Sequence, residues 1–267
     1  MSDFSNVKLY PIPKSQIQNY CLCLSGSEQE RLLINNLVSN CLKRQLQPNQ
    51  KEKWGFLHLN GNILLYGNPG MGKTSIVYEC AMQHPKATLY NINISSLISE
   101  KLGQTEKRVS EFFDEVIVEA EQNATILLLE EIEAFLPNRT SDDLADMKRA
   151  LTVFMQYLDL SLSNLVIFCT TNHKEMLDPA IIRRFSLVLE IKNDSAEAVL
   201  SFLTNENNPF SPSFSDDKCN MEIANLFTKH NLSFSQLKNY MKRIYIAEDN
   251  LCSQSLLTLL KKEYEHE

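Results

Sequence analysis

The sequence predicts an α/β protein in which a parallel, five-stranded sheet lies between layers of helices and is followed by a small, all-helical domain. Three observations support this fold class. Five short apolar runs have the length and composition of buried strands. Amphipathic stretches with helical spacing separate most of these runs, and strands that alternate with helices form a parallel, doubly wound sheet. After residue 191, only helical patterns remain.

The first part of the chain is irregular. Residues 1–20 hold two prolines and scattered apolar residues, and we expect an arm there rather than a domain. Residues 27–44 repeat apolar side chains at helical spacing and predict a helix. A polar loop is expected over 45–53. The strand candidates then follow in order at 62–66, 88–94, 125–129, 165–171 and 186–191.

Helices are predicted between the strands and beyond the last one. Over 105–121 and 142–158, apolar residues occupy one face, which is the pattern of a helix packed on a sheet. The predicted helices beyond the sheet span 195–205, 221–230, 234–249 and 253–264, with a loop over 207–217 after the first. We therefore expect an arm at 1–20, an α/β domain at 21–192 and a helical domain at 193–267.

One stretch fits the pattern G-x-x-x-x-G-K-[ST], the phosphate-binding P-loop. It follows the strand candidate 62–66 and precedes a helical stretch over 75–82, the order that such a loop requires. Its glycines let backbone N–H groups converge on phosphate oxygens, and the helix start adds the positive end of its dipole. Lys73 is expected to contact the β- and γ-phosphates of ATP, and the Thr74 hydroxyl to bind Mg²⁺. The predicted phosphate-binding residues are Gly67, Asn68, Pro69, Gly70, Met71, Gly72, Lys73, Thr74 and Ser75.

A second motif follows the buried run 126–129, which ends in Glu130 and Glu131. A buried strand that ends in paired acids, downstream of a P-loop, is the Walker B arrangement of a P-loop NTPase, an αβα sandwich. We expect Glu130 to bind Mg²⁺ through water, and Glu131 to orient and deprotonate the attacking water. The first acid is usually Asp. Because Glu130 is one methylene longer and Mg²⁺ requires near-ideal octahedral geometry, metal placement or turnover could differ here.

Three further residues are candidates for the same site. Asn172 follows the strand candidate 165–171 and could position water against the γ-phosphate, although Asn is also common in turns. Arg183 and Arg184 precede an aromatic residue. They could form surface ion pairs, but the chain lacks an internal arginine near the nucleotide motifs, so we expect them to serve a neighbouring subunit.

Composition excludes several other classes of protein. The net charge of −7 argues against broad, sequence-independent nucleic-acid binding. No apolar run is long enough for a membrane span, and the N-terminus lacks the features of a secretory signal. The seven cysteines show no C-x-x-C pair and no His partner at zinc spacing. The odd count and the lack of a signal favour a reducing, cytoplasmic location.

Taken together and in this order, the motifs resemble the AAA+ family of ATPases, specifically its AAA branch. The resemblance covers about residues 24–250, and the compact Arg-Arg-Phe form is similar to that of katanin, spastin and short stand-alone bacterial AAA ATPases. It implies that Asn172 is sensor 1 and that Arg183 and Arg184 are arginine fingers reaching the ATP of the adjoining protomer. It also implies that Gly26 lies where the family cups the adenine, and that the helical domain is a lid whose turn at 232–235 faces the nucleotide.

The resemblance implies an ATPase that uses ATP and Mg²⁺, forms a homo-oligomeric ring, expected to be a hexamer, and acts on a protein partner. One position departs from substrate-threading relatives, because their pore-loop aromatic is replaced by Lys101, followed by Leu102 and Gly103. We also expect no folded N-terminal domain, the usual recruiter of substrate in the family.

Two function classes therefore stay open. The first is a remodeller that pulls a protein partner through the ring pore, and a narrower option within it is remodelling of HORMA-type proteins in bacterial defence. The second is a nucleotide-dependent switch or assembly scaffold with little threading. A clamp-loader or initiator role on DNA is a third option, which the acidic charge balance and the Arg-Arg-Phe pattern oppose.

Overall fold

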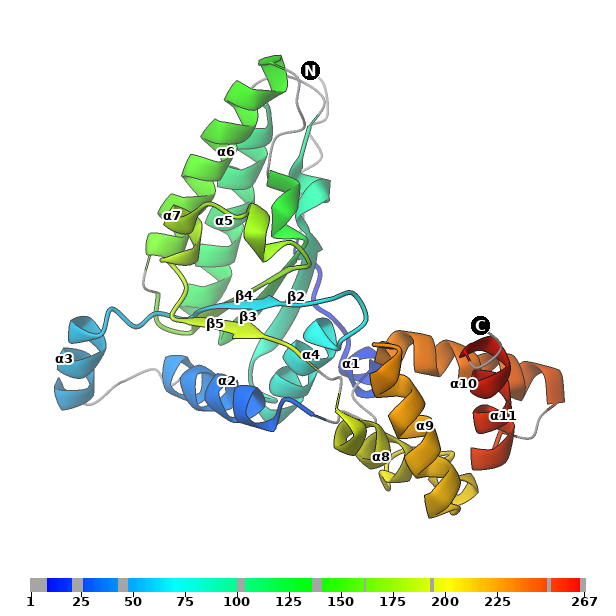
Figure 1. Cartoon of the computed structure of the whole chain (residues 1–267). Helices are drawn as coiled ribbons and strands as arrows, with labels where there is room; N and C mark the ends of the chain where they lie inside the picture. The colour runs from blue at the N-terminus through cyan, green and yellow to red at the C-terminus, as the bar shows by residue number, and fades with distance from the viewer. Residues whose placement is uncertain are drawn as a thin grey trace.

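The computed structural model describes residues 9–20, 26–42, 48–99, 104–135, 141–160, 162–192, 195–248 and 251–264. Figure 1 shows a sheet with helices on both of its faces and, beside it, a group of helices formed by the C-terminal part of the chain. The predicted fold class is confirmed. Among the described residues, no helix is long and apolar enough to cross a membrane.

The sheet contains five parallel strands in the order β2-β3-β4-β1-β5. Their bounds are β1 Asn62–Tyr66, β2 Thr88–Asn93, β3 Thr125–Glu130, β4 Leu165–Thr171 and β5 Leu187–Glu190. The central strands β3, β4 and β1 are apolar along nearly their whole length because both faces of a parallel sheet are covered by helices. Since all five strands run the same way, the residues that follow them gather along one edge of the sheet, the edge formed by the carboxyl ends of the strands.

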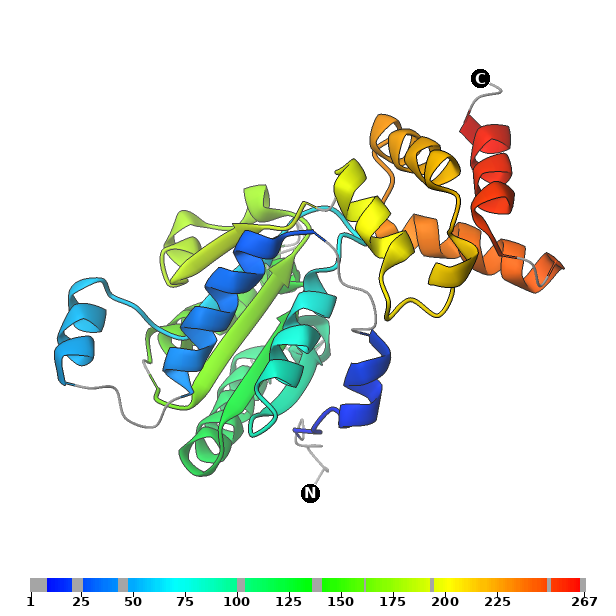
Figure 2. The same ribbon diagram turned by 90° about the horizontal axis from the view of Figure 1, so that it is seen from below.

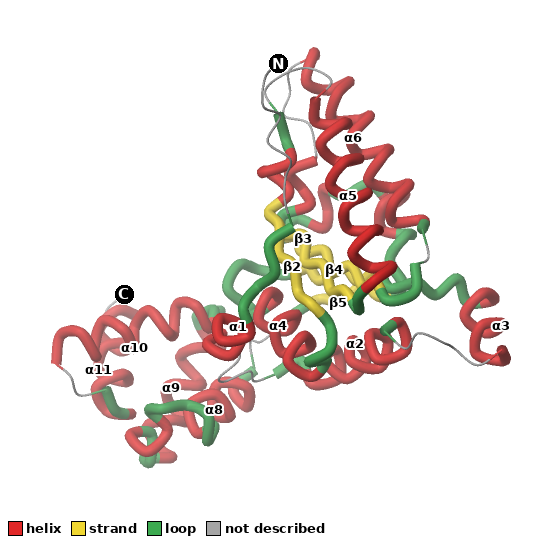
Figure 3. Tube along the Cα trace, turned by 180° about the vertical axis from the view of Figure 1, so that it is seen from behind, coloured by secondary structure: helices red, strands yellow, loops and turns green. Residues whose placement is uncertain are grey.

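Two apolar cores lie on opposite faces of the sheet. Alternate residues of β3 enter each core, with Leu127 and Leu129 on one face and Ile126 and Leu128 on the other. The first face is covered by α5 (Gln104–Gln122) and α6 (Ser141–Asp159), and the second by α2 (Glu28–Cys41) and α4 (Lys73–Gln83). Figure 3 shows the same two layers from behind. The short helix α7 (Pro179–Ile182) leads from β4 into β5.

The C-terminal helices enclose a core of their own. They are α8 (Ala196–Thr204), α9 (Asp217–Lys229), α10 (Phe234–Glu248) and α11 (Ser253–Tyr264), and they bury Phe202, Ile223, Phe227, Leu237 and Leu256 against one another. The prediction that α9 starts at 221 was wrong. The Asp216 side chain accepts hydrogen bonds from the backbone N–H groups of Lys218 and Cys219, which caps the helix one turn earlier.

The prediction of a loop over 45–53 was also wrong for its described part, because Pro48–Phe56 form the helix α3. Proline suits the first position of a helix, and Trp54 packs partly against the core on the α2 and α4 face. Residues 51–53 and 55–56 of α3 are exposed, so the sequence shows no apolar repeat at helical spacing there. Figures 1 and 2 both show α3 projecting from the sheet on the side away from the C-terminal helices.

The described part of the N-terminal arm, 9–20, lies against the edge of the sheet. Pro11 bridges to Tyr90 of the edge strand β2 in antiparallel fashion, and the Ile12 N–H donates to the Leu89 carbonyl over 2.8 Å. The helix α1 (Lys14–Tyr20), which the sequence did not predict, follows and buries Ile17 in the core beside α4. The arm thereby covers one side of an edge strand that would otherwise be open for pairing. Short 3-10 turns occupy Ile94–Leu97, Ile132–Phe135, Lys174–Met176 and Ser211–Ser213.

Candidate active site

The loop between β1 and α4 has the backbone of a phosphate-binding loop. Gly67, Gly70 and Gly72 have φ angles of 141°, 79° and 96°, which side chains other than glycine rarely adopt. A Cβ on Gly67 would lie 2.5 Å from the Ile191 carbonyl oxygen, so the close approach of β1 and the end of β5 also requires glycine. A Cβ on Gly70 would meet the Ser235 side chain at 2.8 Å. The C-terminal helices therefore contact this loop directly.

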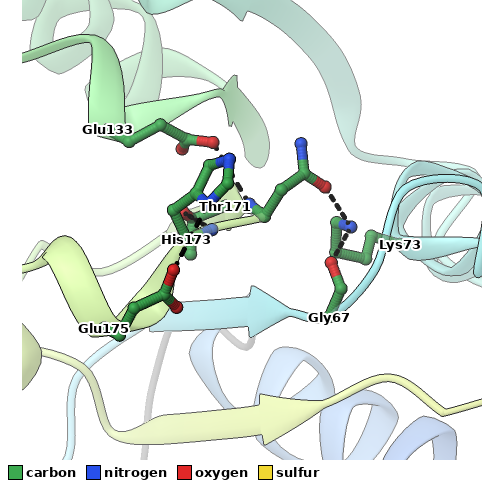
Figure 4. Close-up of polar contacts among 7 residues, drawn as sticks. Gly67, Lys73, Glu133, Thr171, His173 and Glu175 are labelled. Atoms are coloured by element: carbon green, nitrogen blue, oxygen red, sulfur yellow. Dashed lines mark hydrogen bonds and ion pairs between the residues drawn. The ribbon is translucent and has the colours of Figure 1, made fainter.

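Lys73, the first residue of α4, connects this loop to the end of β4. Its ammonium group donates to the Gly67 carbonyl oxygen at 2.6 Å, as Figure 4 shows. It also donates to the Asn68 carbonyl oxygen at 3.0 Å and to Asn172 Oδ1 at 2.7 Å. Burial lowers the pKa of Lys73, and the nearby Glu133 carboxylate partly offsets this effect. The contact with Asn172 brings together two predicted site residues, because their strands β1 and β4 are neighbours in the sheet.

Thr74 and Glu130 form the candidate metal site. The Thr74 hydroxyl donates to Glu130 Oε1 over 2.7 Å, which joins the start of α4 to the end of β3. Hydroxyl and carboxylate oxygens are suitable ligands for Mg²⁺, which usually takes only one or two protein groups together with phosphates and waters. The described residues include no larger cluster of metal-ligating side chains. The residues present therefore fit a Mg²⁺ held jointly with a nucleotide.

Glu131 is turned out of the strand direction by its backbone. Its φ of 60° lies in the left-handed region, so the strand does not continue through this residue. In a continuing strand, the side chains of Glu130 and Glu131 would point to opposite faces of the sheet. Its exposed carboxylate accepts a hydrogen bond from the Asn93 side-chain amide over 2.9 Å. Asn93 is the last residue of β2 and pairs with Glu130 in register. Asn93 was not predicted as a site residue, because asparagine near the end of a strand usually indicates a turn.

The backbone of Asn172 is also fixed. Its N–H donates to Glu133 Oε1 over 3.2 Å, and the N–H of His173 donates to the Thr171 hydroxyl over 3.0 Å (Figure 4). The second oxygen of Glu133 is buried and has no hydrogen-bond partner among the described residues. Glu133 was not predicted as a site residue, and its role here is to hold the turn that carries Asn172.

These groups open into a pocket of about 760 Å³. One wall consists of the phosphate-binding loop and the strand ends, including Asn93, Glu130, Glu131 and Asn172. The rest of the lining comes from α8 and the start of α10, with Phe202, Phe234, Ser235 and Lys238, and the arm adds Ile12 and Gln16. A pocket lined by both polar groups and aromatic rings suits a ligand that has a charged part and a planar part.

Several predicted residues are not brought into this pocket. Among the described residues, Gly26, Arg183 and Arg184 are not part of its lining. Gly26 has a φ of 82°, but residues 21–25 lie outside the described part, as do the predicted pore-loop residues 100–103.

The two arginines differ in their surroundings. Arg184 donates through Nε to Asp159 over 3.1 Å and through a terminal nitrogen to the Ala180 carbonyl over 2.6 Å. Its side chain is 27% exposed. Arg183 is exposed at the end of α7. Arg184 is therefore tied to its own subunit, whereas Arg183 is exposed to solvent.

The sequence matches a known family over residues 63–193, the "ATPase family associated with various cellular activities (AAA)". Fidgetin-like protein 1 of Drosophila melanogaster is 34% identical over 140 residues, which cover 51% of this chain and 26% of the relative. Spastin of Xenopus laevis is 30% identical over 157 residues, which cover 56% of this chain and 26% of the relative. The chain thus spans about a quarter of the length of these curated relatives.

The fold also resembles a solved structure, "Structure of E. coli MS115-1 HORMA:CdnC:Trip13 complex". The TM-score is 0.74, and the match covers 96% of this chain and 94% of the other. At 17% sequence identity, this likeness concerns the fold alone.

Proposed function

With residues 63–193 as its AAA domain, this chain belongs to the AAA branch of the AAA+ ATPases, and we propose that it hydrolyses ATP with Mg²⁺ in the pocket between the sheet and the C-terminal helices. One observation carries the proposal. Side chains from separate segments of the sequence, Lys73, Asn172, Thr74 and Glu130, meet through hydrogen bonds of 2.7 Å at the edge of the sheet where the phosphate-binding loop lies.

Each of these residues has a distinct task. The N–H groups of the loop and the Lys73 ammonium bind the phosphates, with Lys73 exchanging its carbonyl and amide partners for phosphate oxygens. Thr74 and Glu130 would hold the Mg²⁺, which would supply positive charge beside the phosphates. Phe202 and Phe234 supply apolar surface for the base.

Glu131 is the general base in this proposal. It accepts the proton of the attacking water while Asn172 contacts the γ-phosphate end of the nucleotide. Asn93 holds one oxygen of the Glu131 carboxylate. The other oxygen is thereby directed to the water, so less reorientation is required when the reaction begins.

Hydrolysis is proposed to require a second subunit, and a homo-oligomeric ring, such as a hexamer, is the arrangement that supplies one to every site. Arg183 supports this proposal, since it is exposed and lies outside its own pocket. An arginine finger from a neighbour typically raises turnover in related nucleotidases by about 10³–10⁵. ATP would then bridge two subunits and favour their assembly by mass action.

The ring is proposed to remodel or disassemble a protein partner, and a nucleotide-dependent switch with little threading is the alternative. The complex of the structural neighbour contains a HORMA protein, which makes HORMA-type proteins the first class of partner to test. Changing Lys101 and Leu102 to alanine separates the two functions. A threading enzyme would keep its ATPase activity and lose remodelling, whereas a switch would keep both.

The proposed activity is tested by phosphate release from ATP with the full chain. Release should require Mg²⁺, stop when EDTA is added, and be absent from the Lys73→Ala variant, which lacks the cation that binds the phosphates. Equal release by wild type and Lys73→Ala would contradict the proposal.

A further inference from the structure

A chain of polar contacts joins Glu130 to side chains of α4 and β2. Glu130 Oε1 accepts from the Thr74 hydroxyl at 2.7 Å, and Glu130 Oε2 accepts from Asn91 Nδ2 at 3.2 Å. Asn91 Nδ2 also donates to the Tyr78 hydroxyl at 3.3 Å. Both oxygens of the longer Walker B acid are therefore held by side chains.

The fold explains why these four side chains meet. Thr74 and Tyr78 lie four residues apart on α4 and so share one face of that helix. Side chains alternate along strands, and Leu89 of β2 and Leu128 of β3 enter the core on the α4 side. Two residues further along each strand, Asn91 and Glu130 therefore face α4 as well.

The orientation of the Asn91 amide follows from its neighbours. A carboxylate offers only acceptors, so the amide nitrogen and not the oxygen must face Glu130. Its two hydrogens then serve Glu130 and Tyr78, one each. The amide oxygen Oδ1 is buried and has no hydrogen-bond partner among the described residues.

The contacts of Thr74 and Asn91 with Glu130 restrict a side chain that is longer than the usual aspartate. Glutamate has one more rotatable bond than aspartate, so an unrestrained Glu130 carboxylate would spend part of its time away from Thr74. Mg²⁺ tolerates little deviation from octahedral geometry. We propose that Asn91 and Tyr78 are positioning residues that brace the Glu130 carboxylate beside Thr74, so that the longer acid can hold the Mg²⁺ of a bound nucleotide. This inference rests on the proposed function of the same site.

The test measures binding rather than turnover. A fluorescent, non-hydrolysable ATP analogue is titrated in EDTA and in saturating Mg²⁺, and the ratio of the two Kd values is the gain in affinity due to the metal. By linkage, this gain equals the gain in metal affinity due to the nucleotide. Asn91→Leu keeps the size of the side chain and removes the amide. It should reduce the gain in affinity about tenfold, because partners of metal ligands typically contribute 10–100-fold. If the wild-type gain is smaller than about tenfold, the variant should show no gain. The Kd in EDTA should change less than twofold.

A double-mutant cycle with Glu130→Asp shows whether the brace acts on the longer acid. An aspartate at 130 is too short to reach Asn91, so adding Asn91→Leu to Glu130→Asp should change the gain by less than twofold. Equal losses in both backgrounds would mean that Asn91 acts elsewhere and would overturn the inference. An unchanged gain in Asn91→Leu alone would overturn it as well.

Tyr78→Phe provides a second test if Asn91→Leu fails to fold. This change removes only the hydroxyl oxygen of a buried ring and should therefore be tolerated by the fold. It should lower the gain about threefold, as expected for one neutral hydrogen bond, and no change would contradict the brace. Failure of the proposed function gives a different result, because wild type would then bind the analogue no better with Mg²⁺ than without it. Normal wild-type binding with unaffected Asn91 and Tyr78 variants overturns the brace alone.

Discussion

Asn93 donates a hydrogen bond from its side-chain amide to the Glu131 carboxylate over 2.9 Å, which joins the end of β2 to the residue that follows β3. The contact depends on the left-handed backbone of Glu131, whose φ is 60°. Because both residues line the pocket, the relationship fixes the orientation of the proposed general base before a nucleotide arrives.

Asn93→Leu should therefore lower kcat about tenfold, the factor expected for one hydrogen bond to a charged group. The Kd for ATP should change less than twofold, since Asn93 orients the base and does not bind the phosphates. Asn123→Leu is a matched control, because Asn123 makes a similar 3.0 Å hydrogen bond to Glu119 at the far end of α5. Steady-state ATPase assays decide between the outcomes, and equal kcat values for the two variants would refute a role for Asn93.

Gly70→Ala should weaken nucleotide binding. The position has a φ of 79°, and the added Cβ would lie 2.8 Å from the Ser235 side chain, so both the loop and its contact with α10 would have to shift. We expect a loss in affinity of about tenfold, consistent with about 1–2 kcal/mol for a left-handed alanine. Gly55→Ala in α3 is the control, as nothing lies within 4 Å of its Cβ. Titration with labelled ATP measures both, and wild-type affinity in Gly70→Ala would be the contrary result.

Arg183 and Arg184 should give different phenotypes. Arg183→Ala should reduce hydrolysis and leave the melting temperature unchanged, because Arg183 is exposed. Arg184→Ala should also destabilise the fold, by about 1 kcal/mol, since Arg184 bonds Asp159 and the Ala180 carbonyl. Asp159→Asn, the control, should lower stability without changing turnover per folded molecule. Thermal unfolding that is equally affected by all three changes would contradict this division.

Mixing variants tests whether the arginine acts between subunits. Lys73→Ala has an intact Arg183 but a defective pocket, and Arg183→Ala has the reverse. Combining them should restore part of the ATPase activity, because some interfaces then pair an intact pocket with an intact finger. No recovery at any mixing ratio, or full activity of a strictly monomeric wild-type sample, would exclude action in trans.

The strands were predictable from the sequence because both faces of a parallel sheet are buried, which leaves long apolar runs such as 165–171. The helix α3 was not, since its described residues are mostly polar or exposed and only Trp54 packs partly against the core. The start of α9 was missed because one capping residue, Asp216, and not the apolar pattern, sets it.

The site shows the same limit. Lys73 and Asn172 could be placed together in advance, since their motifs follow strands that end at one edge of the sheet. Asn91 and Asn93 could not, because asparagine near a strand end usually indicates a turn. Their roles depend on which strand lies beside β3, and that pairing is a property of the sheet rather than of residue spacing.

The central claim, that this chain hydrolyses ATP with Glu131 as the base, is tested most directly by Glu131→Gln. The amide keeps the shape of the side chain and cannot accept the proton, so ATP should bind within about twofold of wild type while phosphate release falls roughly 10²–10⁴-fold. Single-turnover measurement of phosphate release, alongside the Kd for ATP, gives both numbers. Release within about a factor of two of wild type would contradict the assignment of Glu131 as the base.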